Sequence, residues 1–388
     1  MMATQVKEEA ANASQLSADA AELNLVEFWK QRAALEGLEP RADAQAYRWK
    51  WRDLEPRLRL AGETVPIEDC ERRALVFANP GLGGMPHVTD NLFAAFSLYK
   101  AGETAPVHRH TPCASRFVVE GDGGFTVVEG EKCKMNRGDL IITPAGTWHD
   151  HGNEGSESLI WMDVLDLPIV SKLNLTFFEF DYGEAKADKS GAHPIATGYQ
   201  EVTEADDISQ KLYSAGGMLP LFAPERRGLT GNHSPQFVYR WQAARRALEN
   251  LAGHPGSLHD GLIMEYVNPT NGRPVMPNMS FRVQMLRPGE ETALRRRLST
   301  AVYFCLEGEG LVEVDGEQIE WGRNDVFAMP SWRWSKFKNT GSENAFLYSV
   351  TDEPVVRATG LYREERETAD GGREFVVFTS HGERVVEL

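Results

Sequence analysis

The chain has 388 residues, 41% of them hydrophobic and 25% charged, which is typical of a globular protein with two to three domains. Its 57 acidic residues outnumber its 41 Lys and Arg residues and give a net charge of −16. Binding to the phosphate backbone of nucleic acid depends on a basic surface, so no nucleic-acid partner is expected.

Secretion and membrane insertion are not expected either. No stretch approaches the roughly 20 consecutive apolar residues of a membrane span, and the polar N-terminus lacks the apolar core of a signal peptide. The four cysteines lie far apart without a C-x-x-C motif, which argues against a disulfide framework and a thiolate zinc site. We therefore expect a cytoplasmic protein.

The N-terminal part is predicted to hold a tail and a helical segment. Residues 1–22 are rich in Ala, Ser, Glu and Gln without apolar periodicity, which predicts a disordered tail. Residues 23–70 are predicted to be an N-terminal helical segment, in which residues 23–38 form a packing helix. Its apolar residues recur at the spacing of one helix face: Leu25, Phe28, Trp29 and Ala33.

From residue 71 the sequence changes to short β-type runs separated by Gly, Pro, Asn and Asp. Within residues 71–171 the predicted strands are 74–78, 92–99, 115–120, 125–129, 132–135, 140–143 and 158–165. Strands this short and this evenly spaced are typical of a β-sandwich or a jelly roll. The stretch 172–261 is predicted to be a linker with helices near 207–212 and 242–251.

The β pattern then returns over residues 262–356 and is followed by a C-terminal segment, 357–388. The predicted strands of this second block are 280–286, 301–306, 310–314, 317–321, 326–328 and 345–350. Motifs of the first block recur about 187 residues later, because Leu306–Gly310 matches Val119–Gly123, and Asn324–Pro330 matches Gly138–Pro144. This internal duplication predicts an all-β-dominated fold of two jelly-roll barrels with N-terminal and inter-barrel helices.

Two histidine pairs in the first barrel suggest a metal site. His108 and His110 would project to the same face of a strand, and His149 follows a turn and can come from a neighbouring strand. Three neutral nitrogens on one side leave other coordination positions open, as in catalytic metal sites. The alternative is that these are ordinary histidines on half-exposed strands.

The second barrel provides an internal comparison for this metal site. At the positions equivalent to His108, His110 and His149 it has Arg295, Arg297 and Ser335. The second barrel is therefore predicted to be structural and to hold no metal. The unpaired histidines are interpreted as surface or loop residues: His87, His193, His233, His254, His259 and His381.

These motifs resemble those of the cupins. The segment from Gly102 to His110, with Gly121-x-Gly123, resembles the first cupin motif, and Gly138–His149 resembles the second. Arg116 stands where many cupins have a glutamate ligand. In this respect the chain resembles the gentisate 1,2-dioxygenase family, bicupins that include salicylate and 1-hydroxy-2-naphthoate dioxygenases.

The resemblance implies an Fe(II) ion held by His108, His110 and His149 alone. It also implies roles near the substrate for four further residues: Arg72, Arg116, His151 and Asp163. Relatives often have Trp and Gln near the positions of Phe93 and Ser97, so the ring substituents accepted by this chain stay open. A homotetramer is also implied by the family.

The implied reaction is extradiol-type ring cleavage of a small aromatic 2-hydroxycarboxylate by O2. With gentisate, both oxygen atoms would be inserted between the carboxyl-bearing and hydroxyl-bearing carbons to give maleylpyruvate. Salicylate, substituted salicylates and 1-hydroxy-2-naphthoate are alternative substrates. Two other classes stay open, namely a manganese bicupin decarboxylase or oxidase and a non-catalytic bicupin.

Each residue near the substrate has a functional and a structural interpretation. Arg116 would bind the substrate carboxylate or an oxygen, or form a surface ion pair. His151 would take the phenol proton or serve a structural role. Asp163 would meet His151, an arginine or a substrate hydroxyl, or form a plain ion pair. Of Arg72 and Arg73, one would face the substrate and the other a salt bridge.

Overall fold

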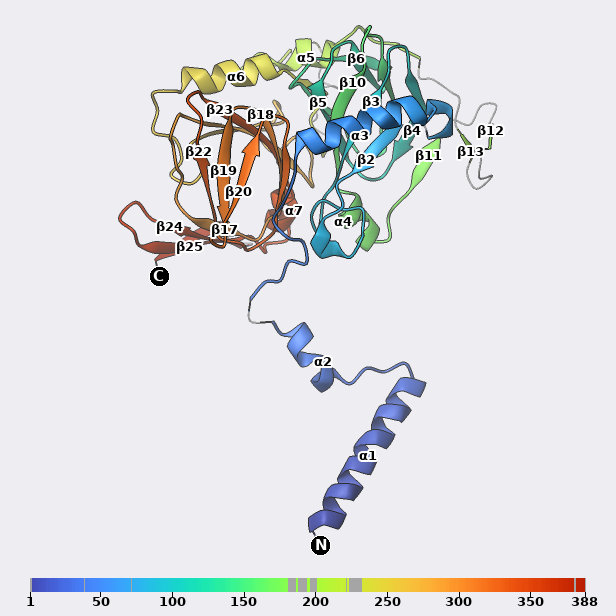
Figure 1. The fold of residues 1–388 in the computed structure, drawn as a ribbon, viewed down its shortest axis with the longest axis vertical. Helices are drawn as coiled ribbons and strands as arrows, with labels where there is room; N and C mark the ends of the chain where they lie inside the picture. The colour runs from blue at the N-terminus through green and yellow to red at the C-terminus, as the bar shows by residue number, and fades with distance from the viewer. Residues whose placement is uncertain are drawn as a thin grey trace. The chain divides into compact units, whose positions relative to one another are not determined.

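The computed structural model divides the chain into two compact units, residues 1–41 and 42–388. The residues that it describes are 2–37, 39–70, 72–180, 186–187, 194–195, 201–220, 222, 232–379 and 382–387. Within the second unit, two β-barrels lie side by side (Figure 1).

The first unit is helical, and here the structure corrects the predicted disordered tail. Helix α1 spans Met2–Glu22, because Ala, Glu and Gln are strong helix formers even without an apolar face. Helix α2 spans only Phe28–Leu35 and has no buried residue. Phe28 is 52% exposed and Trp29 is 63% exposed, so the apolar face of this helix is not buried within its unit.

Barrel one consists of two antiparallel sheets. The order β14-β8-β5-β10-β3-β2 makes the first, with bounds Val238–Tyr239, Leu140–Thr143, Ala114–Glu120, Leu159–Leu165, Phe93–Tyr99 and Arg73–Val76. The order β11-β4-β9-β6-β7 makes the second, with bounds Phe178–Phe180, Thr104–His110, His149–Asn153, Gly124–Val128 and Glu131–Met135.

Barrel two repeats this architecture. Its first sheet has the order β1-β21-β18-β23-β16-β15, with bounds Tyr47–Trp49, Val326–Met329, Ala301–Glu307, Ala345–Thr351, Ser280–Leu286 and Leu262–Glu265. Its second has the order β20-β19-β22-β17-β24-β25-β26, with bounds Glu317–Gly322, Glu309–Val314, Ser335–Asn339, Arg295–Arg297, Arg363–Glu367, Arg373–Thr379 and Gly382–Glu387.

Helices and further short elements lie before, within and between the barrels. The helices are α3 (Trp51–Thr64), α4 (Leu167–Lys172), α5 (Ile208–Tyr213), α6 (Trp241–Asn250) and α7 (Glu353–Ala358). The short elements are η1 (Ile67–Asp69), η2 (Pro80–Leu82), β12 (Lys186–Ala187) and β13 (Pro194–Ile195). None of the described helices is long and apolar enough to cross a membrane.

The predicted duplication and two-barrel fold are confirmed, since every strand of barrel one has a counterpart at the same place in barrel two. The second sheet of barrel two has two further strands, β25 and β26. The structure extends both barrels beyond the predicted ranges. Strand β11 lies within the predicted linker, but it pairs with β4 of barrel one. Strand β24 lies within the predicted C-terminal segment, but it pairs with β17 of barrel two in the same way.

The two halves also exchange their leading segments, which sequence patterns did not predict. Strand β1 precedes barrel one but pairs with β21 of barrel two, and β14 precedes barrel two but pairs with β8 of barrel one. The helix that follows each of these strands begins with a hydrogen bond to an aspartate of the barrel with which the strand pairs. Asp325 accepts the Trp51 N–H at 2.8 Å, and Asp139 accepts the Trp241 N–H at 2.9 Å.

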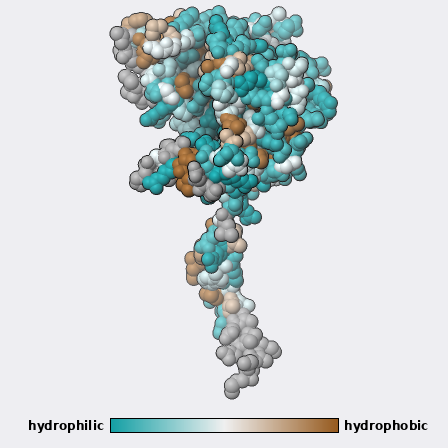
Figure 2. Space-filling model, turned by 90° about the vertical axis from the view of Figure 1, so that its left-hand side faces the viewer, coloured by the Kyte–Doolittle hydropathy of each residue, from teal (hydrophilic) through white to brown (hydrophobic). Residues whose placement is uncertain are grey.

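A second pair of aspartates links the barrels at the ends of β10 and β23. Asp166 accepts a hydrogen bond from the Asn278 amide at 2.7 Å, and Asp352 accepts one from the Asn91 amide at 2.6 Å. Between the barrels, buried aromatic rings form a continuous core, in which Phe117 stacks on Tyr348 at 3.8 Å. Hydrophilic residues cover most of the face seen in Figure 2.

Loss of one aspartate anchor should destabilise the unit 42–388. Asp325→Ala removes the acceptor at the start of α3, which is expected to lower the free energy of unfolding by about 1–2 kcal/mol. Denaturant unfolding measures this change, with Asp122→Ala as a control because Asp122 is exposed. Equal stability of Asp325→Ala and the unmodified protein would contradict the anchoring role.

Candidate metal centre

Three histidines converge inside barrel one. His108 and His110 lie on β4, and His149 lies on β9, where it pairs directly with His108. All three are buried, with exposed fractions of 5% or less. Their ligand atoms lie within 4.8 Å of one another. The described residues thus contain a group that can hold a metal ion, at the positions that the H-x-H spacing predicted.

The backbone fixes the tautomer of each ring. The Nδ1 atoms of His108, His110 and His149 hydrogen-bond to the carbonyls of Pro106, Pro112 and Thr147 at 2.8, 2.7 and 2.9 Å. A carbonyl only accepts, so each Nδ1 carries the proton and each Nε2 keeps its lone pair. The Nε2 atoms of His108 and His149 are buried without a hydrogen-bond partner. These donors fit a divalent transition metal.

The surroundings keep the three imidazoles neutral. Burial lowers the pKa of His108 and His149 well below the usual value, and it lowers the pKa of His110 to about 4. The positive charges of Arg116 and, for His108 and His110, of Arg72 act in the same direction. Neutral imidazole is the form that ligates metals.

Arg116 and Asp163 lie opposite each other on β5 and β10. Arg116 is 1% exposed, so the alternative of a surface ion pair does not apply. Its Nε lies 3.4 Å from Asp163 Oδ1, while Nε and Nη1 have no hydrogen-bond partner. A buried guanidinium with unused donors is suited to bind an anion.

The two adjacent arginines have different surroundings. Arg73 forms a two-pronged ion pair with Glu103 and also donates to the Val65 carbonyl at 2.5 Å. The charge of Arg72 instead lowers the pKa of His108 and His151. Of the two, Arg72 is therefore the one near the histidines.

His151 lies next to the three histidines but outside the ligand group. Its ring centroid is 5.4 Å from that of His108 and 5.5 Å from that of Trp161. Its Nδ1 is buried without a hydrogen-bond partner. Burial, reinforced by the charge of Arg116, lowers its pKa well below the usual value. His151 is therefore a neutral ring beside the centre.

Sequence patterns missed three aromatic residues at this site. Tyr99 stacks on Trp161 at 4.5 Å and meets the ring of His151 edge-on at 5.6 Å. Phe178 and Phe180 on β11 lie 5.2 Å from His110 and 5.8 Å from His108. Only the pairing of β11 with β4 brings these two phenylalanines to the centre, and β11 was assigned to the linker.

In barrel two the equivalent positions hold ion pairs. Arg295 pairs with Ser335 in the register that His108 and His149 have in barrel one. Its guanidinium forms a two-pronged ion pair with Asp260 at 2.6 and 2.8 Å. Arg297 lies 3.6 Å from Glu353. The charges at the second site are thus neutralised by the protein itself.

The other histidines do not join a ligand group among the described residues. His254 is exposed, and His87 and His233 are half-buried. His259 lies in a turn but is buried, and its Nε2 hydrogen-bonds to the Glu367 carbonyl at 2.9 Å. His193 and His381 lie outside the described residues.

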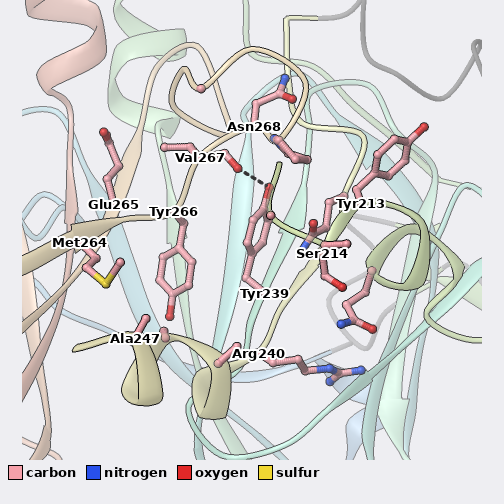
Figure 3. Close-up of a pocket in the computed structure, with 18 of the residues that line it drawn as sticks. Tyr213, Ser214, Tyr239, Arg240, Ala247, Met264, Glu265, Tyr266, Val267 and Asn268 are labelled. Carbon is pink, nitrogen blue, oxygen red and sulfur yellow. Dashed lines mark hydrogen bonds between the residues drawn. The ribbon is translucent and has the colours of Figure 1, made fainter. Parts of the chain in front are cut away.

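A separate cavity of about 600 Å³ lies between α6, β15 and residues 213–219 (Figure 3). Two of its polar side chains are already engaged. Tyr239 donates to the Val267 carbonyl at 3.1 Å, and Arg240 pairs with Asp139 and Asp207. The three-histidine group does not line this cavity. We therefore place the chemistry in barrel one.

Comparison with known proteins identifies the family. A model of the cupin domain matches residues 95–165 and 282–351. The chain is 37% identical to 5-aminosalicylate 1,2-dioxygenase of Comamonas sp., with 96% of each chain covered. It is 34% identical to gentisate 1,2-dioxygenase of Streptomyces sp., covering 91% of this chain and 95% of the relative.

The fold has a close counterpart among solved structures. Salicylate 1,2-dioxygenase from Pseudoaminobacter salicylatoxidans, crystallised with gentisate, matches with a TM-score of 0.81 and 33% identity. The match covers 92% of this chain and 94% of the other. The chain belongs to the gentisate 1,2-dioxygenase family of bicupin oxidoreductases, as the motifs around its histidines predicted.

Proposed function

We propose that this protein is an Fe(II)-dependent dioxygenase that cleaves gentisate between its carboxyl-bearing and ortho-hydroxyl-bearing carbons to give maleylpyruvate. The observation that carries the proposal is the pairing of three buried, proton-free imidazole nitrogens with a buried arginine whose donors are unused. The iron would supply a Lewis acid and the redox chemistry of O2.

The charges inside barrel one support an anionic, chelating substrate. Three neutral imidazoles leave the charge of a divalent ion uncompensated, and Arg72 and Arg116 add positive charge. Asp163 is the one acid that pairs with Arg116 in the part of the chain that the structure describes. A carboxylate and an ortho phenolate would neutralise the excess.

Each polar residue then has a distinct task. Arg116 binds the substrate carboxylate or an oxygen atom during ring opening, and Arg72 contributes charge on the same side. His151 accepts the phenol proton, because its neutral ring lies beside His108 with Nδ1 unpaired. Asp163 keeps the guanidinium of Arg116 in place.

Salicylate, 5-substituted salicylates and 1-hydroxy-2-naphthoate are the alternative substrates. They are favoured by the 37% identity to 5-aminosalicylate 1,2-dioxygenase. The small residues Ala74 and Ser97, which lie opposite each other on β2 and β3, also favour them. Oxygen uptake by anaerobically iron-loaded protein, with each substrate in parallel, decides among them. Uptake with none of them would overturn the proposed function.

The first prediction from this site concerns the metal. We expect about one iron per chain, measured by elemental analysis, because among the described residues only barrel one has a set of ligands. The double variant His108→Ala/His110→Ala should lose its iron, whereas His254→Ala should keep it because His254 is exposed. Two irons per chain would contradict the assignment of barrel two.

The second prediction concerns Arg116. Arg116→Lys should fold and keep iron but lose roughly 10²–10³-fold in turnover, because an ammonium cannot replace a planar two-pronged donor. Arg333→Lys on the surface of barrel two serves as the matched control. A nearly unchanged kcat/KM for Arg116→Lys would remove Arg116 from the substrate site.

The third prediction separates His151 from the ligands. His151→Ala should keep iron, should still show a spectral change with substrate under anaerobic conditions, and should turn over ~10²–10⁴-fold more slowly. His149→Ala should instead lose the metal. Iron-free His151→Ala beside iron-replete His149→Ala would mean that the two residues have exchanged roles.

A further inference from the structure

The carboxylate of Asp163 is held by residues that the proposed reaction has not yet used. Asp163 is 3% exposed, and its Oδ2 accepts hydrogen bonds from Ser97 Oγ at 2.6 Å and from Trp161 Nε1 at 3.0 Å. Its other oxygen, Oδ1, lies 3.4 Å from Arg116 Nε. One oxygen is thus fixed by two neutral donors, and the other faces the guanidinium.

Strand register builds this network into the sheet. Strand β10 lies between β3 and β5, with Trp161 opposite Ser97 and Asp163 opposite Arg116. Because alternate residues of a strand share a face, all four side chains lie on the same side of three adjacent strands. The sheet therefore carries a connected set of polar side chains, from Ser97 and Trp161 through Asp163 to Arg116. The charge of Arg116 acts on His108 of the metal centre.

The guanidinium needs this support because little else fixes it. Nε and Nη1 of Arg116 have no hydrogen-bond partner, and the positive charge of Arg72 acts against it. A buried carboxylate is itself costly unless its oxygens accept hydrogen bonds. Ser97 and Trp161 meet that need without adding charge, so Oδ1 stays free to attract Arg116.

We propose that Ser97 and Trp161 are positioning residues for ring cleavage. They fix the carboxylate of Asp163, which in turn holds the Arg116 guanidinium toward the anionic substrate; this inference rests on the proposed function. Asp163 then acts through Arg116 and does not touch the substrate. The proposal gives Ser97, whose role the sequence left open, the task of orienting the Asp163 carboxylate.

Two conservative variants isolate the two donors. Ser97→Ala removes one hydroxyl, and Trp161→Phe removes the indole N–H while keeping an aromatic ring beside Tyr99. Each should keep its iron and lower kcat/KM roughly 10- to 100-fold, the usual effect of losing a hydrogen bond to a charged group. Anaerobic calorimetric titration with the preferred hydroxybenzoate should show weaker binding, and Ser97→Thr should restore part of the loss.

Matched controls exist on the same scaffold. Ser115 is a fully buried serine beside Arg116, but its Oγ lies 3.4 Å from the Val164 carbonyl and does not reach Asp163. Trp321 in barrel two is buried with its indole N–H unpartnered. Ser115→Ala and Trp321→Phe should therefore leave kcat/KM and substrate binding unchanged.

A double-variant cycle completes the test. If Ser97 acts through Arg116, Ser97→Ala should cost little further activity in an Arg116→Lys background. Full additivity, or a Ser97→Ala protein with normal kcat/KM and binding, would overturn the positioning role while the unmodified enzyme still cleaved its substrate. An unmodified, iron-loaded protein that binds no hydroxybenzoate would instead overturn the proposed function.

Discussion

The metal centre depends on three short hydrogen bonds from imidazole Nδ1 atoms to backbone carbonyls. They run from His108, His110 and His149 to residues two positions away, so the strand ends themselves set the ring orientation. Once each Nδ1 is protonated, each Nε2 keeps a lone pair, and those of His108 and His149 are buried without a hydrogen-bond partner. One metal cation can satisfy all three lone pairs together, and the rest of barrel one provides what surrounds it.

The second constraint is unbalanced charge. Barrel one buries Arg116 with a single carboxylate at 3.4 Å and keeps Arg72 close to the histidines. Barrel two buries Arg295 as well, but gives it the two-pronged pair with Asp260. An active site that binds an anion has to leave positive charge without a partner. In a structural core a buried charge without a partner would only destabilise the fold.

The chemistry of the site was readable from sequence because it lies in local patterns. H-x-H on a strand and a shared turn motif place His108, His110 and His149 together, and the duplication predicts both barrels. Features that depend on pairing between strands far apart in the chain could not be predicted from the sequence. The phenylalanines of β11, the exchange of β1 and β14, and the choice of Arg72 over Arg73 all require the register of the folded sheets.

The duplication also explains why the scaffold tolerates such different centres. Arg295 and Ser335 occupy the same paired positions as His108 and His149, so strand pairing at this point does not depend on a metal. In barrel two an Arg–Asp pair fills the interior, and the sheet order is unchanged. The fold therefore stands on its aromatic core and its exchanged segments. Barrel one can keep a polar, incompletely satisfied interior, because buried apolar residues lie between the barrels as well as within each of them.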